Sequence, residues 1–228
     1  DALVSVVADL LAGSTETDLA NPLVQRFLET LGVEMAPMMV ASSRDDARRA
    51  AEALGYPVVL KAGGRTDRVV GERGGTALDL HDSDELTAAY ERMSARSDFL
   101  PAIVQPMAEL GVHLEIRLEH DRSRGARMTF GPARGGVGDR AHQVLPVGSD
   151  ELHRLVESPV VRSWLGERAD RDALRSLLAA LAGAASYDEI SLVELQPVLV
   201  QRGRAIAVEA SVQVGAVQAR PLDDVRHL

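Results

Sequence analysis

The sequence predicts an α+β fold. Two observations indicate it: apolar runs of strand length alternate with amphipathic helices in the first half of the chain, and the chain closes on a strand–turn–strand pattern. That pattern, over residues 190–212, turns at Arg202 and Gly203 and favours α+β over an all-parallel sheet. With 228 residues, 46% of them hydrophobic, the chain can form one large domain or two small ones.

The first half predicts three helices and four strands. The first helix, NPLVQRFLETLGV at 21–33, has apolar side chains at helical spacing, begins at Asn21 and Pro22, and stops at Gly32. The elements that follow are, in order, a strand at 36–42, a helix at 42–55 that is capped by Ser43 and ended by Gly55, a strand at 56–62, a strand at 76–81 that alternates at Thr76, Leu78 and Leu80, a helix at 82–96 and a strand at 101–108.

The second half predicts two strands, a loop, two helices and the closing hairpin. VHLEIRLEHD and ARMTFGP are strands joined by a polar turn, and ARGGVGDRAHQ is a glycine-rich loop. SDELHRLVESPVVRSWLG and DRDALRSLLAALAGAA are each one helix. These elements cover residues 112–121, 126–132, 133–143, 149–166, 170–185 and 190–212.

Composition excludes several classes of protein. A net charge of -9, with arginines scattered among carboxylates, argues against a nucleic-acid or anionic-membrane surface. The chain has no cysteine, so it has neither disulfides nor a thiolate metal site. The opening DALVSVVADLLAG is too short to span a bilayer and carries Asp1 and Asp9 where a signal peptide would be basic. We therefore expect a cytoplasmic location and no membrane partner, and the missing initiator Met indicates a fragment of a longer protein.

Lys61 is the single lysine among 25 lysine and arginine residues. It ends an apolar strand and precedes a loop that contains Gly63, Gly64, Gly71, Gly74 and Gly75. Lysine is a compact charge on a thin stem, whereas arginine is a wide fork, so a crowded phosphate pocket could require lysine here. Glycine-rich loops let backbone amides approach phosphate oxygens. A plain surface hairpin with a lysine retained by chance is the alternative.

Charged and amide side chains also gather on two other predicted strands. In the stretch 112–121, alternation puts the polar side chains on one face, which is either solvated or lines a charged cleft. Glu194 and Gln196 share one side of a strand, and Glu209 comes from the strand that returns. Such oxygen donors can hold Mg2+ bridged to phosphates, and an ordinary polar hairpin face is the alternative.

Taken in order, these motifs resemble the ATP-grasp fold. Within it, the chain is similar to the nucleotide-binding domain of ADP-forming acyl-CoA synthetases, relatives of the succinyl-CoA synthetase beta subunit. The motifs that carry the resemblance are LGVEMAP, AEALGYPVVLKAGG, the glycine pair at 74 and 75, IVQPM, GVHLEIRLEHD, TFGP and ISLVELQPVLV, which span roughly residues 22 to 212.

The resemblance implies a site for ATP or ADP with Mg2+. Lys61 is similar to the lysine that meets the nucleotide phosphates, and residues 103–107 are similar to the hinge whose backbone reads the adenine edge. Glu194 matches the acid that helps receive a phosphohistidine loop from a partner domain, and is the implied catalytic residue. The implied nucleotide-binding residues are Lys61, Gly74, Gly75, Ile103, Val104, Gln105, Met107 and His113, and the implied Mg2+ ligands are Gln196 and Glu209.

The resemblance also implies a division into subdomains. Residues 33–104 would form the small lid and residues 105–228 the larger subdomain, with the nucleotide cleft between them. Residues 1–32 would be a helical segment that packs on the larger subdomain.

The sequence departs from the family pattern at positions where the family carries its phosphate-handling and metal-binding residues. Val69 and Val70 stand where the family carries a His-Lys pair, and neither can bind or shuttle phosphate. His113 stands where a Glu is usual, and the second glycine-rich loop offers only Asp139 in place of a Glu. Both implied metal ligands are one methylene longer than usual. The fold tolerates such changes, because function lives in the site and not in the scaffold.

Two hypotheses follow from the resemblance. The first is the ATP-binding domain of an ADP-forming acyl-CoA synthetase-like protein, a ligase whose catalysis needs CoA-binding and phosphohistidine-bearing, succinyl-CoA-ligase-like domains elsewhere in the protein or on a partner. The second is a non-catalytic sensor or scaffold, since some relatives fuse a degenerate synthetase region to a protein N-acetyltransferase domain. Retained Lys61, Glu194 and Glu209 favour nucleotide binding, whereas Val69 and Val70 favour the second hypothesis.

Overall fold

The computed structural model shows a mixed α+β chain, which confirms the predicted fold class. The residues it describes are 2–13, 16–18, 22–63, 75–96, 98–108, 111–121, 124–136, 139–167 and 169–215. The chain divides into two compact units: a small unit, Ala36–Glu109, and a large unit, which combines Asp1–Met35 with Leu110–Leu228. In the described part of the chain, no helix has the length and apolar character that crossing a membrane requires.

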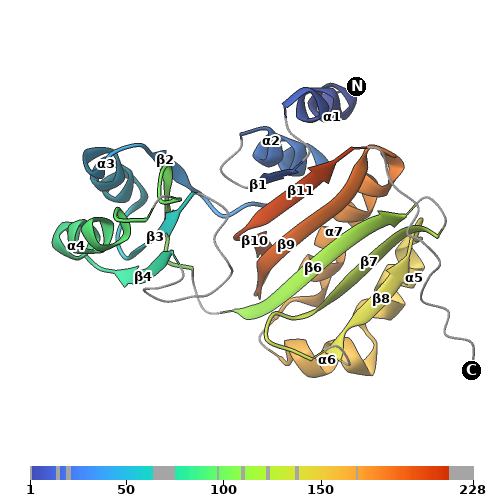
Figure 1. The fold of residues 1–228 in the computed structure, drawn as a ribbon. Coiled ribbons are helices and arrows are strands. Elements are labelled where there is room, and N and C mark those ends of the chain that lie inside the picture. Colours follow the sequence, from blue (N-terminus) through green and yellow to red (C-terminus); the bar gives the residue numbers. More distant parts are fainter. Residues whose placement is uncertain are drawn as a thin grey trace, which may run out of the picture. The chain divides into compact units, whose positions relative to one another are not determined.

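The small unit is an antiparallel sheet of four strands with two helices against one face (Figure 1). The strand order is β2-β5-β3-β4, so β5 and β3 are central. The apolar core between sheet and helices includes Leu60, Leu86 and Phe99, all at most 1% exposed. The elements are β2 (Met39–Ala41), α3 (Arg44–Leu54), β3 (Val58–Ala62), β4 (Thr76–Leu80), α4 (Ser83–Met93) and β5 (Ala102–Pro106).

Side-chain caps fix where both helices begin. The Ser43 hydroxyl accepts a hydrogen bond from the Asp46 amide, 3.1 Å away, at the start of α3. Asp82 caps α4 by accepting from two backbone amides, each at 2.9 Å. Gly55 ends α3 at a φ of 84°, a conformation that glycine adopts without steric cost. These boundaries agree with the sequence-based expectations.

The strand β4 forms as expected, but its alternation is broken. Val58 lies opposite Leu80, whereas Leu60 lies opposite Ala77, so the ladder shifts register between them. Asp79 has a φ of 60°, which turns the strand locally and leaves Leu78 43% exposed. The expected alternation of Thr76, Leu78 and Leu80 was therefore wrong, because this bulge interrupts the pleat.

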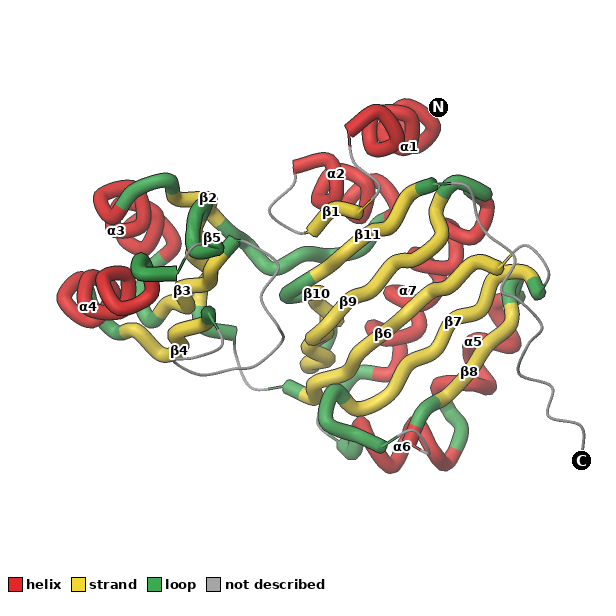
Figure 2. The backbone as a smooth tube through the Cα atoms, viewed as in Figure 1, coloured by secondary structure: helices red, strands yellow, loops and turns green. Residues whose placement is uncertain are grey.

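The large unit is a seven-stranded sheet in the order β1-β11-β9-β6-β7-β8, with β10 also paired to β9. Figures 1 and 2 show α5, α6 and α7 together on one face of this sheet. Helix α2 contacts α7 and β11, and α1 contacts α2. The elements are α1 (Ala2–Gly13), β1 (Glu16–Asp18), α2 (Pro22–Leu31), β6 (Val112–Asp121), β7 (Gly125–Pro132), β8 (Ala141–Val144), α5 (Ser149–Val156), α6 (Pro159–Leu165), α7 (Arg171–Ala182), the 3-10 turn η2 (Gly183–Ser186), β9 (Ile190–Gln201), β10 (Arg204–Ala207) and β11 (Ala210–Val214).

Alternation along β6 separates the two faces of this sheet as the sequence predicts. Leu114, Ile116 and Leu118 are at most 1% exposed. On the neighbouring strand β7, Phe130 is fully buried and stacks edge-on against Trp164 of α6, with ring centroids 6.0 Å apart. The apolar face is thus the one that the helices cover, and the charged side chains of β6 lie on the other face.

Three expectations for the large unit were wrong in detail. The helix expected at 149–166 is two helices, because Pro159 has no N–H to continue α5 and its predecessor Ser158 is extended. The loop expected at 133–143 already contains the start of β8 at Ala141. This strand forms through its pairing with β7, and its sequence has no apolar pattern that would have predicted it.

The returning strand of the closing hairpin is also interrupted. It forms β10 and β11, which share one register on β9: Ala207 lies opposite Val198 and Ala210 opposite Leu195. This register sets Val208 opposite Pro197. The Val208 amide donates to the Pro197 carbonyl at 2.9 Å, but proline has no N–H to return the bond. Half of this pair is therefore missing, and the strand breaks there.

Candidate functional site

Lys61 lies on the central strand β3 of the small unit, opposite Thr76 of β4 and Ile103 of β5. All five residues of this strand are buried, and Lys61 itself is 9% exposed. Lysine is almost never buried to this extent unless its ammonium group has a partner or a task. The burial of Lys61 therefore distinguishes it from an ordinary surface lysine.

The loop after Lys61 begins with a glycine that packing requires. A Cβ on Gly63 would lie 1.7 Å from the Pro101 carbonyl oxygen, and the Gly63 amide donates to the Phe99 carbonyl at 3.2 Å. That amide is therefore already used, and Gly63 serves the sheet and not a phosphate. Gly75, at a φ of 73°, directly precedes β4, and its carbonyl accepts from the Ala62 amide at 2.8 Å. The predicted positions Gly74, Val69 and Val70 lie outside the described residues.

The predicted adenine-reading segment is strand β5 and the residues just after it. Ile103 and Val104 lie between two paired strands, β2 and β3, so the sheet encloses their backbone. Pairing with β2 ends at Val104, whereas pairing with β3 continues through Gln105 to Pro106. The Met107 amide donates to the Pro57 carbonyl at 2.8 Å. The part of the segment beyond the β2 edge is thus Gln105 to Met107.

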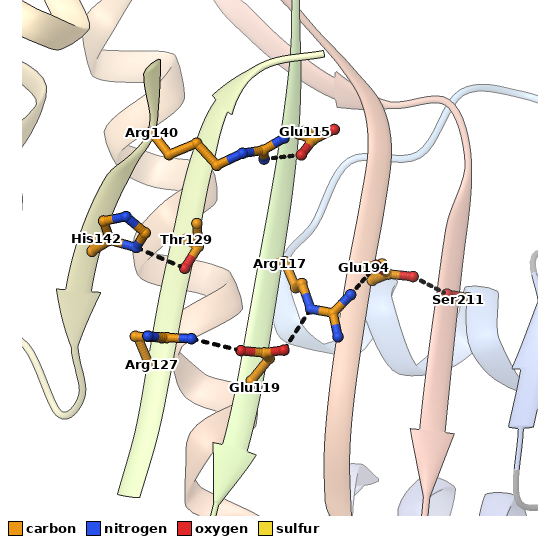
Figure 3. Close-up of polar contacts among 9 residues, drawn as sticks. All are labelled: Glu115, Arg117, Glu119, Arg127, Thr129, Arg140, His142, Glu194 and Ser211. Carbon is orange, nitrogen blue, oxygen red and sulfur yellow. Dashed lines mark hydrogen bonds and ion pairs between the residues drawn. The ribbon is translucent and has the colours of Figure 1, made fainter. Parts of the chain in front are cut away.

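A chain of ion pairs crosses the polar face of the large sheet (Figure 3). Arg117 lies directly opposite Glu194 in the β6–β9 ladder, and its guanidinium contacts one Glu194 oxygen and one Glu119 oxygen, each at 2.7 Å. The second Glu119 oxygen accepts from Arg127 at 2.9 Å. The second Glu194 oxygen accepts from the Ser211 hydroxyl at 3.4 Å. Residues of four strands, β6, β7, β9 and β11, therefore form one network.

A second cluster on the same face is centred on Glu115. One of its oxygens forms an ion pair with Arg140, and the other accepts from the Gln196 side-chain amide at 2.9 Å. Glu115 and Arg140 are 20% and 22% exposed, so both are largely shielded. Nearby, Thr129 and His142 lie within hydrogen-bond distance across β7 and β8. Every carboxylate of this face that Figure 3 shows has a cationic partner.

These ion pairs change the acidity of one carboxylate, Glu119. Burial raises the pKa of Glu119, but the hydrogen bond from Arg127 and the charge and hydrogen bond of Arg117 outweigh it, and the pKa lies below its ordinary value. The charged form of Glu119 is therefore the one that the folded protein favours.

The predicted site residues divide between the two units. Lys61, Gly75 and the segment at 103–107 belong to the small unit. In the large unit, Glu194 and Gln196 lie on β9. The backbone amide of Gln196 donates to the backbone carbonyl of Glu209 at 3.0 Å. His113 is exposed on β6, and its carbonyl accepts from the Ala133 amide. The remaining predicted position, Asp139, accepts from the Gly136 amide at 3.0 Å and closes its own turn.

The side chains around Gln196 do not fit a magnesium ion. Mg2+ requires oxygen ligands in near-octahedral geometry, and carboxylates are its usual protein ligands. Here the Gln196 side chain presents its amide nitrogen to Glu115, Arg140 contacts Glu115, and Arg117 contacts Glu194 on the same strand as Gln196. Among the described residues, no group of three or more His, Asp or Glu side chains could hold a metal ion.

Sequence reasoning missed the arginines that hold this face together. The alternation of β6 placed Arg117 among its carboxylates, but nothing local indicated that Glu194 is its partner or that Arg140 reaches Glu115. Those partners depend on register, and the β6–β9 ladder shifts between Leu114 and Ile116. The shift sets Arg117 opposite Glu194, a detail that no sequence pattern fixes.

Two antiparallel sheets with helices on one face, a buried strand lysine in the first and a carboxylate-lined face in the second, define a particular class of α+β protein. Residues 11–214 match the family model of the ATP-grasp domain. This chain belongs to the ATP-grasp domain family.

Curated relatives place the chain near ADP-forming acetate–CoA ligases. It is 30% identical to acetate–CoA ligase [ADP-forming] I of Archaeoglobus fulgidus over 190 residues, which are 76% of this chain but 27% of that protein. It is 22% identical to the beta subunit of acetate–CoA ligase [ADP-forming] I of Pyrococcus furiosus, over 84% of this chain and 90% of that subunit. The chain thus spans about a quarter of the length of the single-chain relative and most of the separate subunit.

Solved structures share the fold. The acetyl-coenzyme A synthetase 1 of Ca. Korarchaeum cryptofilum, in complex with coenzyme A and Ca-AMPCP, superimposes with a TM-score of 0.78 at 22% identity. That match covers 94% of this chain and 100% of the other. PH1788 from Pyrococcus horikoshii matches with a TM-score of 0.75 at the same identity.

Proposed function

We propose that this chain binds ATP or ADP as the ATP-grasp domain of a protein related to ADP-forming acyl-CoA synthetases. The observation that carries the proposal is the single, buried Lys61. It stands on the central strand of a small sheet, directly before the glycine-containing stretch at 63–75. A lysine ammonium is a compact positive charge that forms charge-assisted hydrogen bonds with phosphate oxygens, and Lys61 stands where such a contact would adjoin a glycine-containing stretch.

The proposal assigns roles to the other predicted residues of the small unit. The adenine edge would contact the backbone near Gln105 and Met107, because the strand pairing with β2 has ended there. Ile103 and Val104 would support that contact from inside the sheet. Gly74 and Gly75 would flank the phosphates on the return from the loop.

In the large unit, the proposal assigns roles at its carboxylate-lined face. His113 would contact the nucleotide from β6, and Glu194 would meet the phosphohistidine loop of a partner domain. CoA-binding and succinyl-CoA-ligase-like domains would come from the remainder of the protein or from a partner subunit. In support, the Pyrococcus relative is a separate beta subunit, and the Archaeoglobus relative is a single longer chain.

Titration calorimetry with ATP and ADP tests the proposal through Lys61. One charge-assisted phosphate contact contributes about 1.5–3 kcal/mol, so Lys61→Ala should weaken nucleotide binding by roughly tenfold to a hundredfold. Lys61→Arg should also weaken it, because the planar guanidinium is wider than the ammonium. Arg48→Ala is the matched control, since it removes an exposed cation from α3 of the same unit. Equal affinity in wild type and Lys61→Ala would remove Lys61 from the phosphate site.

A second candidate function is a non-catalytic nucleotide sensor or scaffold, with an acetyltransferase domain as a candidate partner. One observation favours it: arginines occupy the carboxylates on the face where phosphoryl transfer would take place. The valines at 69 and 70 act in the same direction, because they offer no charge or proton to a phosphate. Both candidates share nucleotide binding and differ in turnover.

A further inference from the structure

Three carboxylates on the polar face of the large sheet have both of their oxygens engaged. Glu194 receives Arg117 and Ser211, and Glu119 receives Arg117 and Arg127. The third carboxylate, Glu115, is contacted by Arg140 at one oxygen and by the side-chain amide of Gln196 at the other. All six oxygens thus have a donor in contact, and an arginine guanidinium contacts each of the three carboxylates, so a metal ion would meet a positive charge at every one of them.

We propose that Arg117 and Arg140 are the resident cations of this face, and that they exclude a divalent metal ion from it. The guanidinium groups neutralise Glu194 and Glu115 in place. A nucleotide bound by this domain therefore binds without Mg2+. This last consequence rests on the nucleotide binding proposed above, whereas the exclusion of metal stands on the arginines alone.

The arginines reduce the negative charge of this face. Glu115, Glu194 and Glu209 together carry a charge of -3, and Arg117 and Arg140 carry +2, so these five side chains sum to -1. A divalent cation would meet two like charges in direct contact with the very oxygens it needs.

The sheet holds the guanidinium of Arg117 where it is. Arg117 and Glu194 are register partners on neighbouring strands, and Glu119 lies two residues further along the same face of β6. Glu194 is 18% exposed and Arg117 45% exposed, so the pair is partly shielded from water. Rotation of Arg117 away from this position would break contacts to two carboxylates at once.

Titration of the protein with Mn2+ alone, followed by electron paramagnetic resonance of the free ion, tests the exclusion. We expect no binding to wild type at concentrations that saturate the double variant Arg117→Gln/Arg140→Gln, a gain in affinity of more than about tenfold. Arg204→Gln is the matched control, because it removes a guanidinium of the large unit that pairs with Glu34 and not with any of these three carboxylates. Arg117→Lys keeps the charge and should still exclude the ion.

Each result decides the inference. If wild type binds Mn2+, and Glu194→Gln or Glu115→Gln weakens that binding, the inference is overturned. It is also overturned if the folded double variant binds no Mn2+, because the arginines would then not be what excludes the ion. Thermal melting by circular dichroism checks folding, and Arg117→Gln alone replaces the double variant if that protein fails to fold.

Calorimetry with ATP in excess EDTA and in saturating Mg2+ tests the consequence for nucleotide binding. We expect wild-type affinity to agree within about threefold between the two conditions, and binding that requires Mg2+ would overturn metal-independent binding. If ATP binds in neither condition, the proposed function fails, and the Mn2+ titration still decides the role of the arginines.

Discussion

At the scale of single residues, Lys61 and Gly63 are close neighbours with different tasks. Lys61 is conspicuous in the sequence because no other lysine remains, and its burial on β3 is the fact that the sequence could not supply. Gly63 looks in the sequence like one more loop glycine. Its contacts instead show a residue that lets the β3 end pass against the backbone at Phe99 and Pro101.

Gly63→Ala should destabilise the protein by more than about 1 kcal/mol, because the added Cβ would overlap the Pro101 carbonyl and the backbone would have to move. Chemical denaturation followed by circular dichroism measures the loss. Gly136→Ala is the control, since its Cβ would come no closer than 3.7 Å to a neighbouring atom. Similar stability for the two variants would show that the close approach at Gly63 relaxes easily.

The candidate site was predictable in its residue types and not in its partners. Alternation placed Glu194 and Gln196 on one side of a strand, and placed the charged side chains of β6 on one face, and the structure has both. The pairing of Arg117 with Glu194 follows from a bulge between Leu114 and Ile116. A one-residue shift in register exchanges every neighbour across a ladder, so long-range contacts decide what local patterns cannot.

At the scale of elements, Asp170 joins a helix to a turn. One of its oxygens caps α7 by accepting from the amides of Asp172 and Ala173, and the other accepts from the Gly203 amide in the β9–β10 turn. The hydrogen bond from Ala173 is the main cause of a pKa for Asp170 below its ordinary value; burial opposes it, and the Gly203 bond adds to it. One side chain thus holds the N-terminus of the helix beside the hairpin.

Asp170→Ala should cost about 0.5–2 kcal/mol of unfolding free energy, the range for loss of a helix cap. The loss should lie near the upper end, because the Gly203 contact disappears as well. Asp170→Asn should retain part of the cap through its amide oxygen. Asp172→Ala is the matched control on the same helix, since its exposed ion pair with Arg175 contributes little. Equal losses at 170 and 172 would contradict the role of the cap.

The β6–β7 pair should make stability depend on pH through Glu119. Because the folded-state pKa of Glu119 is lowered, its contribution is fully present above the ordinary glutamate pKa of 4.5 and is lost as pH falls through the lower folded value. Thermal melting from neutral to acidic pH should therefore show a steeper decline for wild type than for Glu119→Gln. The exposed Glu52→Gln serves as control, and parallel curves for wild type and Glu119→Gln would contradict the assignment.

Element prediction succeeded where caps and periodicity are local and failed where a proline or a distant strand decides. Helix α3 begins at Ser43, the cap that the sequence indicates. The break between α5 and α6 does have a local signal in the sequence, Pro159, although a single helix was expected there. Strand β8 has no such signal, because its four residues become a strand only through pairing with β7.

At the scale of the whole molecule, the fold is that of an ATP-grasp domain. The scaffold keeps both sheets and the strand lysine. The face that carries the carboxylates has instead become a set of internal ion pairs. These ion pairs are the observation on which the second candidate function, the non-catalytic one, rests.

The full-length protein should form no acyl-CoA from ATP, CoA and short-chain acids. Val69 and Val70 offer no charge or proton to a phosphate in transit, and Arg117 and Arg140 occupy two of the carboxylates. Labelled ATP with chromatographic detection of acyl-CoA measures turnover, and the Archaeoglobus ligase provides the positive control. A thermal shift with ATP, lost in Lys61→Ala, shows that the preparation is folded and binds. Robust acyl-CoA formation would overturn the non-catalytic candidate.

The insertion of the small unit between Met35 and Leu110 sets an order for synthesis on the ribosome. The small unit is one unbroken segment with its own core, so it leaves the exit tunnel complete and can fold early. The large sheet has to wait for β9, its central strand, and for β11. Until then α2, whose buried residues are Val24, Phe27 and Leu28, can contact α1 but not α7 and β11, which are not yet made. We expect the nascent chain to expose this helix for most of translation, which makes α2 the segment that a ribosome-associated chaperone would shield.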